Sequence, residues 1–285
     1  MSDKWDSFYL AHKTGMYQDR HWLWQIFPEI FPLPPDKSYD ECYCEKSCCQ
    51  HCGILPLSQL PCAHTPKYSS LFSKDGLQSF RHVETPFPPR DYSHQCVEVL
   101  EVGCGVGNTS FPLLEKNAEI SLTCGDFSQA AVDIFKQRPR FNSEFINCSV
   151  IDATSFQTER KFDFVVLMFV LSALNEQQII IALQNCVQCL KTGGTLLIFD
   201  YAAGDYREEK RLKRGETGTC TAFGRLLERQ NELTQALYFN QGFKEYIERE
   251  YETKEYKIHT KQETNRKTGE QWVKQYVLAK IGKTE

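Results

Sequence analysis

Short apolar runs alternate with amphipathic stretches from Val97 onward. The runs VEVLEV, ISLTC, EFINCSV, FDFVVLMFV and TLLIFDY have the length and composition of buried strands, and residues 108–116, 128–137 and 175–191 have helical periodicity. Strands that are apolar on both faces and alternate with helices are typical of a parallel sheet covered by helices on each side. The pattern therefore predicts one α/β domain over residues 96–285.

The end of this domain has a different pattern. A helix is expected at about 226–239, and two β-rich runs at 243–251 and 272–281 are expected to extend the sheet as an edge pair. These segments complete the predicted domain.

The N-terminal third of the chain is not expected to belong to the sheet. Trp5, Phe8, Tyr9 and His12 lie at the i, i+3, i+4, i+7 spacing of one helix face, and we interpret residues 1–35 as an aromatic N-terminal cap. Residues 36–95 are rich in proline and cysteine and have little periodicity, so they are expected to form an insertion or linker.

Composition narrows the class of protein. Of the 285 residues, 41% are hydrophobic and 25% are charged, which excludes collagen-like and wholly disordered chains. The longest apolar run, residues 164–174, is too short for a bilayer span, and the N-terminus has no secretory or mitochondrial targeting pattern. We expect no contact with a membrane. The expected location is the cytoplasm, and the nucleus is a second candidate.

Charge is unevenly distributed along the chain, whose net charge is -4. Residues 1–206 carry 16 Lys/Arg and 24 Asp/Glu, whereas residues 207–285 carry 17 and 13. The positive C-terminal part is a modest indication of a surface that faces a polyanion, although mixed charges of this kind are also common on solvated helix faces.

Thirteen cysteines is a high count for a chain without a secretory signal, in which thiols stay reduced. Six of them lie between residues 42 and 62, close to His51 and His64. Thiolates at these separations can converge on one structural zinc, but paired C-x2-C knuckles are absent, so a Cys-rich loop without metal is the alternative. The candidate ligands are Cys42, Cys44, Cys48, Cys49 and Cys52. The other seven cysteines look scattered, and no special role is expected for them.

The strongest chemical indication is LEVGCGVGN at residues 100–108, which ends a predicted strand and opens a predicted helix. Gly103, Gly105 and Gly107 allow a tight turn and the close approach of a ligand to the main chain. Their G-x-G-x-G spacing differs from the G-x-G-x-x-G of dinucleotide sites. The spacing therefore favours S-adenosylmethionine over NAD.

Acidic residues follow the next two predicted strands. Asp126 ends the second strand, where a carboxylate can accept the hydrogen bonds of a ribose diol. Asp152 follows the third strand, where it could accept from an adenine amino group while Ala153 supplies a backbone amide. Either residue alone is more often a cap or turn residue, but the series after three successive strands indicates a nucleoside cofactor.

Eight short segments spread over the chain form a specific combination. In chain order they are W-D-x-F-Y from residue 5, D-R-H-W-L from 19, F-P-E from 27, L-E-V-G-C-G-V-G-N from 100, D-F-S from 126, F-V-L-S-A-L from 169, D-Y from 200 with a later Asp205, and N-R-K from 265. Together they resemble the tRNA 3-methylcytidine methyltransferases. The resemblance implies a class I methyltransferase, with a Rossmann-like fold, that uses S-adenosylmethionine to form 3-methylcytidine in tRNA at position 32 of the anticodon loop.

The resemblance also implies roles for individual residues. Trp5 and Tyr9 would close over the cofactor, and Arg20 and His21 would face the tRNA. The implied cofactor contacts are Gly103, Asp126, Asp152, Ala153 and Met168, to which we add Glu101, Gly105 and Gly107 of the glycine motif. The implied partner is tRNA, and an auxiliary protein or an aminoacyl-tRNA synthetase is a further candidate, because members of the family often act with a second protein.

Methylation of cytosine N3 makes modest chemical demands. The N3 lone pair is unprotonated at neutral pH, so no base is required and in-line placement lowers the barrier. The product ring is cationic, so a carboxylate beside it is useful. Asp200, at the end of the fifth predicted strand, and Asp205 are the candidates for this carboxylate, and Tyr201 could stack on a flipped base.

The chain departs from the family pattern in three places. These are Gln18, the insertion of residues 36–95, and the segment KRGETGTCTAFGR that follows Asp205. Two alternatives to tRNA methylation therefore stay open. One is methylation of a protein or small molecule on the same fold, and the other is a non-catalytic subunit that binds the cofactor or acts as an adaptor.

Overall fold

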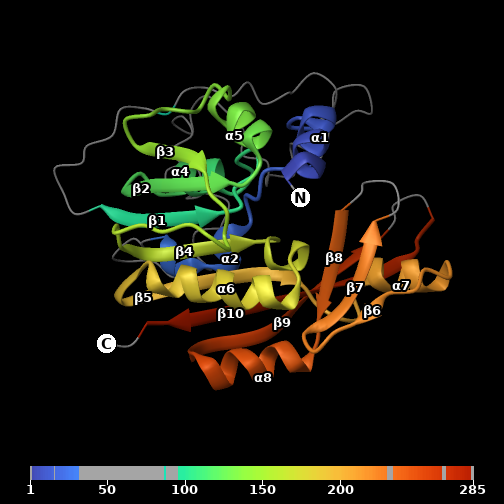
Figure 1. The fold of residues 1–285 in the computed structure, drawn as a ribbon. Helices are drawn as coiled ribbons and strands as arrows, with labels where there is room; N and C mark the ends of the chain where they lie inside the picture. The colour runs from blue at the N-terminus through green and yellow to red at the C-terminus, as the bar shows by residue number, and fades with distance from the viewer. Residues whose placement is uncertain are drawn as a thin grey trace, which may run out of the picture.

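The structure of the chain, a computed structural model, describes residues 2–15, 17–31, 87, 96–229, 234–264 and 268–283. Its centre is a seven-stranded sheet in the order β3-β2-β1-β4-β5-β10-β9 (Figure 1). The strands are β1 Val97–Val102, β2 Ile120–Asp126, β3 Ile146–Val150, β4 Phe162–Met168, β5 Leu190–Tyr201, β9 Glu252–Thr264 and β10 Gln271–Gly282. The first five strands in this order, β3-β2-β1-β4-β5, are parallel to one another. Strand β10 runs antiparallel to both β5 and β9. The predicted α/β fold with a mostly parallel sheet is confirmed.

Helices cover both faces of the sheet (Figure 1). They are α4 Ser110–Lys116 and α5 Gln129–Lys136 on one face, and α6 Glu176–Gln188 and α8 Gln241–Glu250 on the other. Neighbouring residues of a strand point to opposite faces, so Val99 of β1 packs with α4 and α5, whereas Leu100 packs with α6 and α8. This alternation explains why the central strands are apolar along their whole length.

The N-terminal segment packs on the face that α4 and α5 cover. It contains α1 Ser2–His12, α2 Leu23–Ile26 and the short helix η1 Pro28–Ile30. Leu23, Ile26 and Ile30 are buried in the same core as Phe111 of α4. Asn117 Nδ2 donates to Ile30 O at 2.7 Å, which fixes the end of η1 to the end of α4.

The predicted helix at 226–239 is wrong. These residues form most of a hairpin, β7 Gly224–Arg229 and β8 Thr234–Phe239, which joins β6 Thr219–Cys220 in a second, three-stranded sheet. The segment is rich in helix-forming residues, but local propensity is a weak preference that tertiary packing overrides. Here strand pairing buries Leu227 beside Tyr201 and buries Leu237 in the main core.

The predicted strand at 243–251 is also wrong, because these residues form α8. Phe243, Tyr246 and Ile247 follow the i, i+3, i+4 spacing of a helix, and all three are buried. Asn240 begins the helix by accepting a hydrogen bond from Gly242 N at 2.9 Å. The predicted run at 272–281 is confirmed as part of β10. Its edge partner is β9, which begins directly after residues 243–251.

The parallel strands bring several loops to one edge of the sheet. The segments after β1, β2, β4 and β5 meet there, and they include η5 Leu171–Ala173 and α7 Tyr206–Lys213. Ligands of open α/β sheets bind at this carboxyl edge. Among the described residues no helix is both long enough and apolar enough to cross a membrane.

Candidate active site

The glycine loop joins β1 to α4 in a conformation that side chains disfavour. Gly103, Gly105 and Gly107 have φ angles of 77°, 53° and 93°. Gly103 N donates to Gly125 O at 2.7 Å, which holds the loop against the end of β2. A Cβ on Gly103 would lie 2.4 Å from Val170 Cγ2, so both backbone conformation and space exclude a side chain there.

Asp126 fixes the loop from the end of β2. Its Oδ2 accepts from Gly105 N at 2.9 Å, and its Oδ1 accepts from Ser128 N at 3.0 Å. Burial raises the pKa of Asp126 to about 6, and the two amide donors oppose this shift. Because each carboxylate oxygen can accept a second hydrogen bond, the side chain retains acceptor capacity for a ligand on the loop.

Helix α1 lies beside α5 (Figure 1), and its Tyr9 approaches the glycine loop. Tyr9 is buried, and a Cβ on Gly105 would lie 2.8 Å from Tyr9 Oη. Asp6 Oδ1 accepts from Ser128 Oγ at 2.5 Å, which ties α1 to the start of α5. The Trp5 and Tyr9 ring centroids are 5.9 Å apart. The structure thus brings Trp5 and Tyr9 to the loop, and their closure over a cofactor stays a prediction.

The D-R-H-W segment runs along the end of the glycine loop. Asp19 Oδ1 accepts from Asn108 Nδ2 at 2.9 Å, and Asp19 Oδ2 accepts from Arg138 Nη2 at 3.1 Å. Arg20 N donates to Asn108 O at 2.8 Å, and Arg20 Nη1 donates to Thr109 Oγ1 at 2.7 Å. Asp19 was not among the predicted site residues, yet it positions the backbone that carries Arg20.

Arg20 and His21 have different surroundings. Arg20 Cζ lies 5.3 Å from the centroid of the Phe169 ring. Burial lowers the pKa of Arg20, and the Glu101 carboxylate opposes this effect. The His21 side chain is 55% exposed, and its Nδ1 lies 3.3 Å from Glu115 Oε2. Of the two residues, only Arg20 contacts the segment after β4.

Glu101 in β1 is buried with one unsatisfied oxygen. Ser110 Oγ donates to Glu101 Oε2, whereas Glu101 Oε1 has no hydrogen-bond partner among the described residues. Burial raises the pKa of Glu101 to about 7, against the hydrogen bond from Ser110 and the charge of Arg20. A buried polar atom without a partner is costly, so a donor group of a ligand at the loop would stabilise this carboxylate.

The other predicted cofactor residues lie at different depths. Met168, the last residue of β4, and Ala153 are buried, whereas Asp152 is exposed. Asp152 Oδ1 accepts from Thr154 N at 2.8 Å and from Thr154 Oγ1 at 2.7 Å, a pattern typical of a turn. Ile151 N donates to Asp126 O at 3.1 Å, which keeps this turn beside the end of β2. Cofactor contacts of these three residues stay predictions.

Asp200 is buried near the end of β5, and both of its carboxylate oxygens have partners. Oδ2 accepts from Ser172 N at 3.0 Å, and Oδ1 accepts from Tyr201 N at 2.8 Å. Burial raises the pKa of Asp200 to about 6, and hydrogen bonds from Ser172 oppose the shift. The carboxylate therefore links η5 to β5 and keeps an anionic centre between the two segments.

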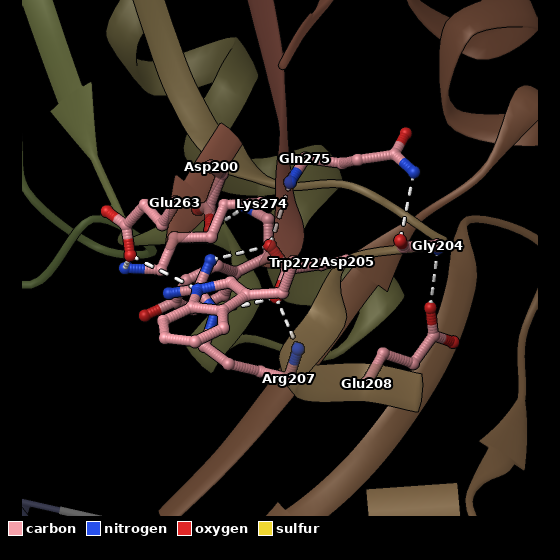
Figure 2. A network of polar contacts seen from close by, with 10 residues as sticks. Asp200, Gly204, Asp205, Arg207, Glu208, Glu263, Trp272, Lys274 and Gln275 are labelled. Carbon is pink, nitrogen blue, oxygen red and sulfur yellow. Dashed lines mark hydrogen bonds and ion pairs between the residues drawn. The ribbon is translucent and has the colours of Figure 1, made fainter. Parts of the chain in front are cut away.

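Asp205 is fully buried and is paired with Arg207 (Figure 2). It accepts from Arg207 N, Nε and Nη2 at 2.8, 2.6 and 2.8 Å, and from Gln275 N at 2.8 Å. Arg207 Cζ lies 4.4 Å from the centroid of the Tyr201 ring and 5.3 Å from that of Tyr276. The structure thus gives Asp205 the position of a residue that caps α7 and orients Arg207 against Tyr201. The catalytic roles of Asp205 and Tyr201 stay predictions.

Phe169 is a candidate site residue that the sequence analysis did not single out. It directly follows β4 with a φ of 60°, and it is half-buried. Strained non-glycine residues of this kind cluster at functional sites. The Phe169 and Tyr201 ring centroids are 5.0 Å apart. The sequence signal that could have identified Phe169 is the F-V-L-S-A-L motif, of which it is the first residue.

Three of the seven cysteines that look scattered in the sequence converge in the structure. The Sγ atoms of Cys104, Cys124 and Cys148 all lie within 4.8 Å of one another, and all three residues are buried. The predicted zinc ligands between Cys42 and Cys52 lie outside the described residues, as does the N-R-K segment at 265–267.

Comparison with known proteins gives consistent matches. A family profile described as "Methyltransferase domain" matches residues 100–196. A chicken (Gallus gallus) protein named "tRNA N(3)-cytidine methyltransferase METTL2" is 31% identical over 74% of this chain and 62% of its own length. The zebrafish (Danio rerio) protein of the same name is 32% identical over 75% of this chain and 55% of its own length. The chain thus matches less than two thirds of either relative.

Solved structures support the fold. A "putative methyltransferase" from Bacillus halodurans superposes with a TM-score of 0.50 at 13% identity, and the match covers 67% of this chain and 94% of that protein. The sheet order, the glycine loop at the end of β1 and the acidic residue at the end of β2 are those of a class I methyltransferase. The chain therefore has a class I methyltransferase fold, and over about three quarters of its length its sequence is similar to proteins named tRNA N(3)-cytidine methyltransferase.

Proposed function

We propose that this protein transfers a methyl group from S-adenosylmethionine to N3 of a cytidine in tRNA, at position 32 of the anticodon loop. The observation that carries the proposal is the contact between Arg20 and Phe169. It joins the D-R-H-W segment to the segment after β4, at the sheet edge where the glycine loop lies. Two relatives that match about three quarters of the chain are named tRNA N(3)-cytidine methyltransferase.

The described residues fit S-adenosylmethionine. The glycine loop presents main chain where side chains are excluded, and Asp126 retains acceptor capacity for the hydroxyls of a ribose. Glu101 Oε1 is buried without a partner and can accept from the amino group of the methionine part. Trp5 and Tyr9 would cover the bound molecule. We assign the cofactor to these five groups.

The chemistry of the transfer is simple. Bound S-adenosylmethionine supplies an electrophilic methyl group, and the cytosine N3 lone pair forms the new bond while the methyl–sulfur bond breaks, which leaves a cationic ring. No residue of the chain has to remove a proton from N3, since N3 carries none at neutral pH. The task of the protein is therefore to hold the ring in line with the methyl group and to balance its positive charge.

Residues near the end of β4 can do both. The half-buried ring of Phe169 offers an aromatic face for a flipped base. Arginines lie over both rings, Arg20 at 5.3 Å from that of Phe169 and Arg207 at 4.4 Å from that of Tyr201. Because Tyr201 is buried and Phe169 is only half-buried, Phe169 is the more available of the two for stacking. Asp200 accepts hydrogen bonds from the backbone amides of Ser172 and Tyr201. Its carboxylate supplies negative charge at the same edge of the sheet.

Recognition of tRNA needs positive charge outside the pocket. In this proposal Arg20 would meet a phosphate next to the flipped base, and the positive C-terminal part of the chain would contact the remainder of the RNA. An auxiliary protein or an aminoacyl-tRNA synthetase is proposed as a further partner, and cytoplasm and nucleus are the proposed locations.

The test is incorporation of labelled methyl groups into total tRNA, followed by digestion to nucleosides. We expect the label in 3-methylcytidine. Label in another nucleoside, or in protein, would overturn the proposed substrate, and no label even with added cell extract would overturn the proposed enzyme. A rate that rises when extract is added would identify a requirement for a partner.

A further inference from the structure

Three cysteines from different elements meet beneath the glycine loop. Cys104 lies within that loop, Cys124 lies in β2 and Cys148 lies in β3, where it pairs with Cys124 in the strand register. Their relative exposures are 3%, 0% and 5%. All three Sγ atoms lie within 4.8 Å of one another. Their clustering results from the fold, since 44 residues separate the first from the last.

The three thiols form a small polar centre inside an apolar core that contains Phe111 and Val132. Cys104 Sγ also donates to Gly105 O at 3.6 Å, so the cluster is in contact with the main chain of the glycine loop. Thiolates, and not thiols, are the sulfur species that bind metals.

We propose that Cys104, Cys124 and Cys148 form a binding site for one thiophilic cation, either zinc or monovalent copper. Thiolates select these ions over harder cations. With metal–sulfur bonds of about 2.3 Å, three sulfurs around one ion in a plane are about 4.0 Å apart, so the trio has to contract by less than about 1 Å. Binding forms three metal–sulfur bonds and releases the protons of the thiols to solvent, so affinity should fall as pH falls.

The position of the site has a consequence for the cofactor loop. Cys104 stands between Gly103 and Gly105, and Cys124 lies two residues before Asp126. A cation held by all three sulfurs would tie the loop to β2 and β3. It should therefore raise the melting temperature of the protein, by roughly 2 °C or more at saturating metal.

The experiment must separate this site from the cysteines at 42–52. The full chain is prepared with Cys42, Cys44, Cys48, Cys49 and Cys52 all changed to Ser, loaded under reducing conditions with Zn²⁺ or with Cu⁺, gel-filtered and analysed for metal. We expect about one equivalent of one of the two ions, and a further Cys148→Ala change should abolish its retention. Cys186→Ala is the matched control, because Cys186 is equally buried but lies in α6 on the other face of the sheet.

Two results would overturn the proposal. One is less than about a tenth of an equivalent of either metal in the parent variant, since thiolate-held metal survives gel filtration. The other is undiminished metal in Cys148→Ala. If Cys148→Ala does not fold, the parent variant loaded with Cd²⁺ replaces it, and the absence of a sulfur-to-cadmium charge-transfer band would then count against the site.

Discussion

Tyr9 of α1 and Gly105 of the glycine loop are packed so closely that a Cβ on Gly105 would stand 2.8 Å from Tyr9 Oη. The phenol of an N-terminal helix thus forms part of the wall of a loop that lies 96 residues later in the chain. Since Asp126 Oδ2 also accepts a hydrogen bond from Gly105 N, one glycine connects α1, β1 and β2. The N-terminal helix is therefore a structural part of the candidate cofactor site.

Gly105→Ala should weaken the binding of S-adenosylmethionine and lower stability. The substitution combines a positive φ of 53° with the clash against Tyr9, and the left-handed conformation alone costs an alanine about 1 to 2 kcal/mol. Gly193→Ala is the control, because Gly193 has a φ of 79° and no atom within 4 Å of its Cβ position. We expect a larger loss of stability in urea for Gly105→Ala than for Gly193→Ala. Equal losses would show that the contact with Tyr9 is unimportant.

The affinity for S-adenosylmethionine should depend on the ionisation of Asp126. The ionised carboxylate accepts hydrogen bonds from a ribose, so affinity should be constant well above the pKa of about 6 and fall by up to about tenfold per pH unit below it. The effect on folding has the opposite sign. Because the folded pKa is raised, the protonated form is favoured in the folded protein, and this contribution to stability is lost as pH rises from about 4 through about 6.

Calorimetric titration of the protein with S-adenosylmethionine, from about pH 4 to about pH 7, tests this dependence on native protein and on Asp126→Asn. Asp126→Asn should bind about 5- to 100-fold more weakly at pH 7, the equivalent of about 1 to 3 kcal/mol, and with a flatter pH profile. Glu101→Gln is a necessary comparison, because Glu101 lies in β1, directly before the same loop, and burial raises its pKa to about 7. A pH dependence that disappears in Glu101→Gln and persists in Asp126→Asn would assign the effect to Glu101.

The five parallel strands of the central sheet could be predicted from sequence because they are short, mainly apolar runs in a chain that alternates such runs with amphipathic stretches. The edge strand β9 was not predicted, because its sequence is mostly polar and exposed. The hairpin of β7 and β8 could not, since residues 226–239 carry helix-forming side chains and only contact with Tyr201 and the main core decides their conformation. In α8 the helical spacing of Phe243, Tyr246 and Ile247 was present in the sequence, but the aromatic and β-branched composition favoured a strand.

The candidate site was predictable to a similar extent. Gly103, Asp126 and Arg20 lie in short motifs, so their sequence context was sufficient to select them. The hydrogen bond from Gln275 N to Asp205 and the contact of Arg20 with Phe169 join segments that are distant in the chain, so sequence context does not give them. The convergence of Cys104, Cys124 and Cys148 depends on strand register, which periodicity alone does not give.

Asp200→Asn should lower turnover about 100-fold, or about 3 kcal/mol in the transition state, and leave cofactor affinity nearly intact. The change removes the negative charge at this edge of the sheet and one acceptor for the amides of Ser172 and Tyr201. Asp163→Asn is the matched control, since Asp163 pairs with Lys191 at the opposite end of β4. Single-turnover rates and calorimetry provide the two measurements. A near-native rate for Asp200→Asn would mean that placement alone explains the reaction.

Arg20→Ala should weaken the binding of tRNA and reduce its salt dependence, without a comparable effect on the cofactor. Arg20 is held by Thr109 Oγ1 and lies against Phe169, so its charge is fixed at the edge where a flipped base would enter. If it pairs with one phosphate, the slope of log affinity against log salt should decrease by about 1. Arg160→Ala is the control, because Arg160 pairs with Glu98 at the start of β1, away from this edge. Weaker binding with an unchanged slope would instead mean that Arg20 contacts the base, beside Phe169. Unchanged binding would mean that the RNA does not contact Arg20.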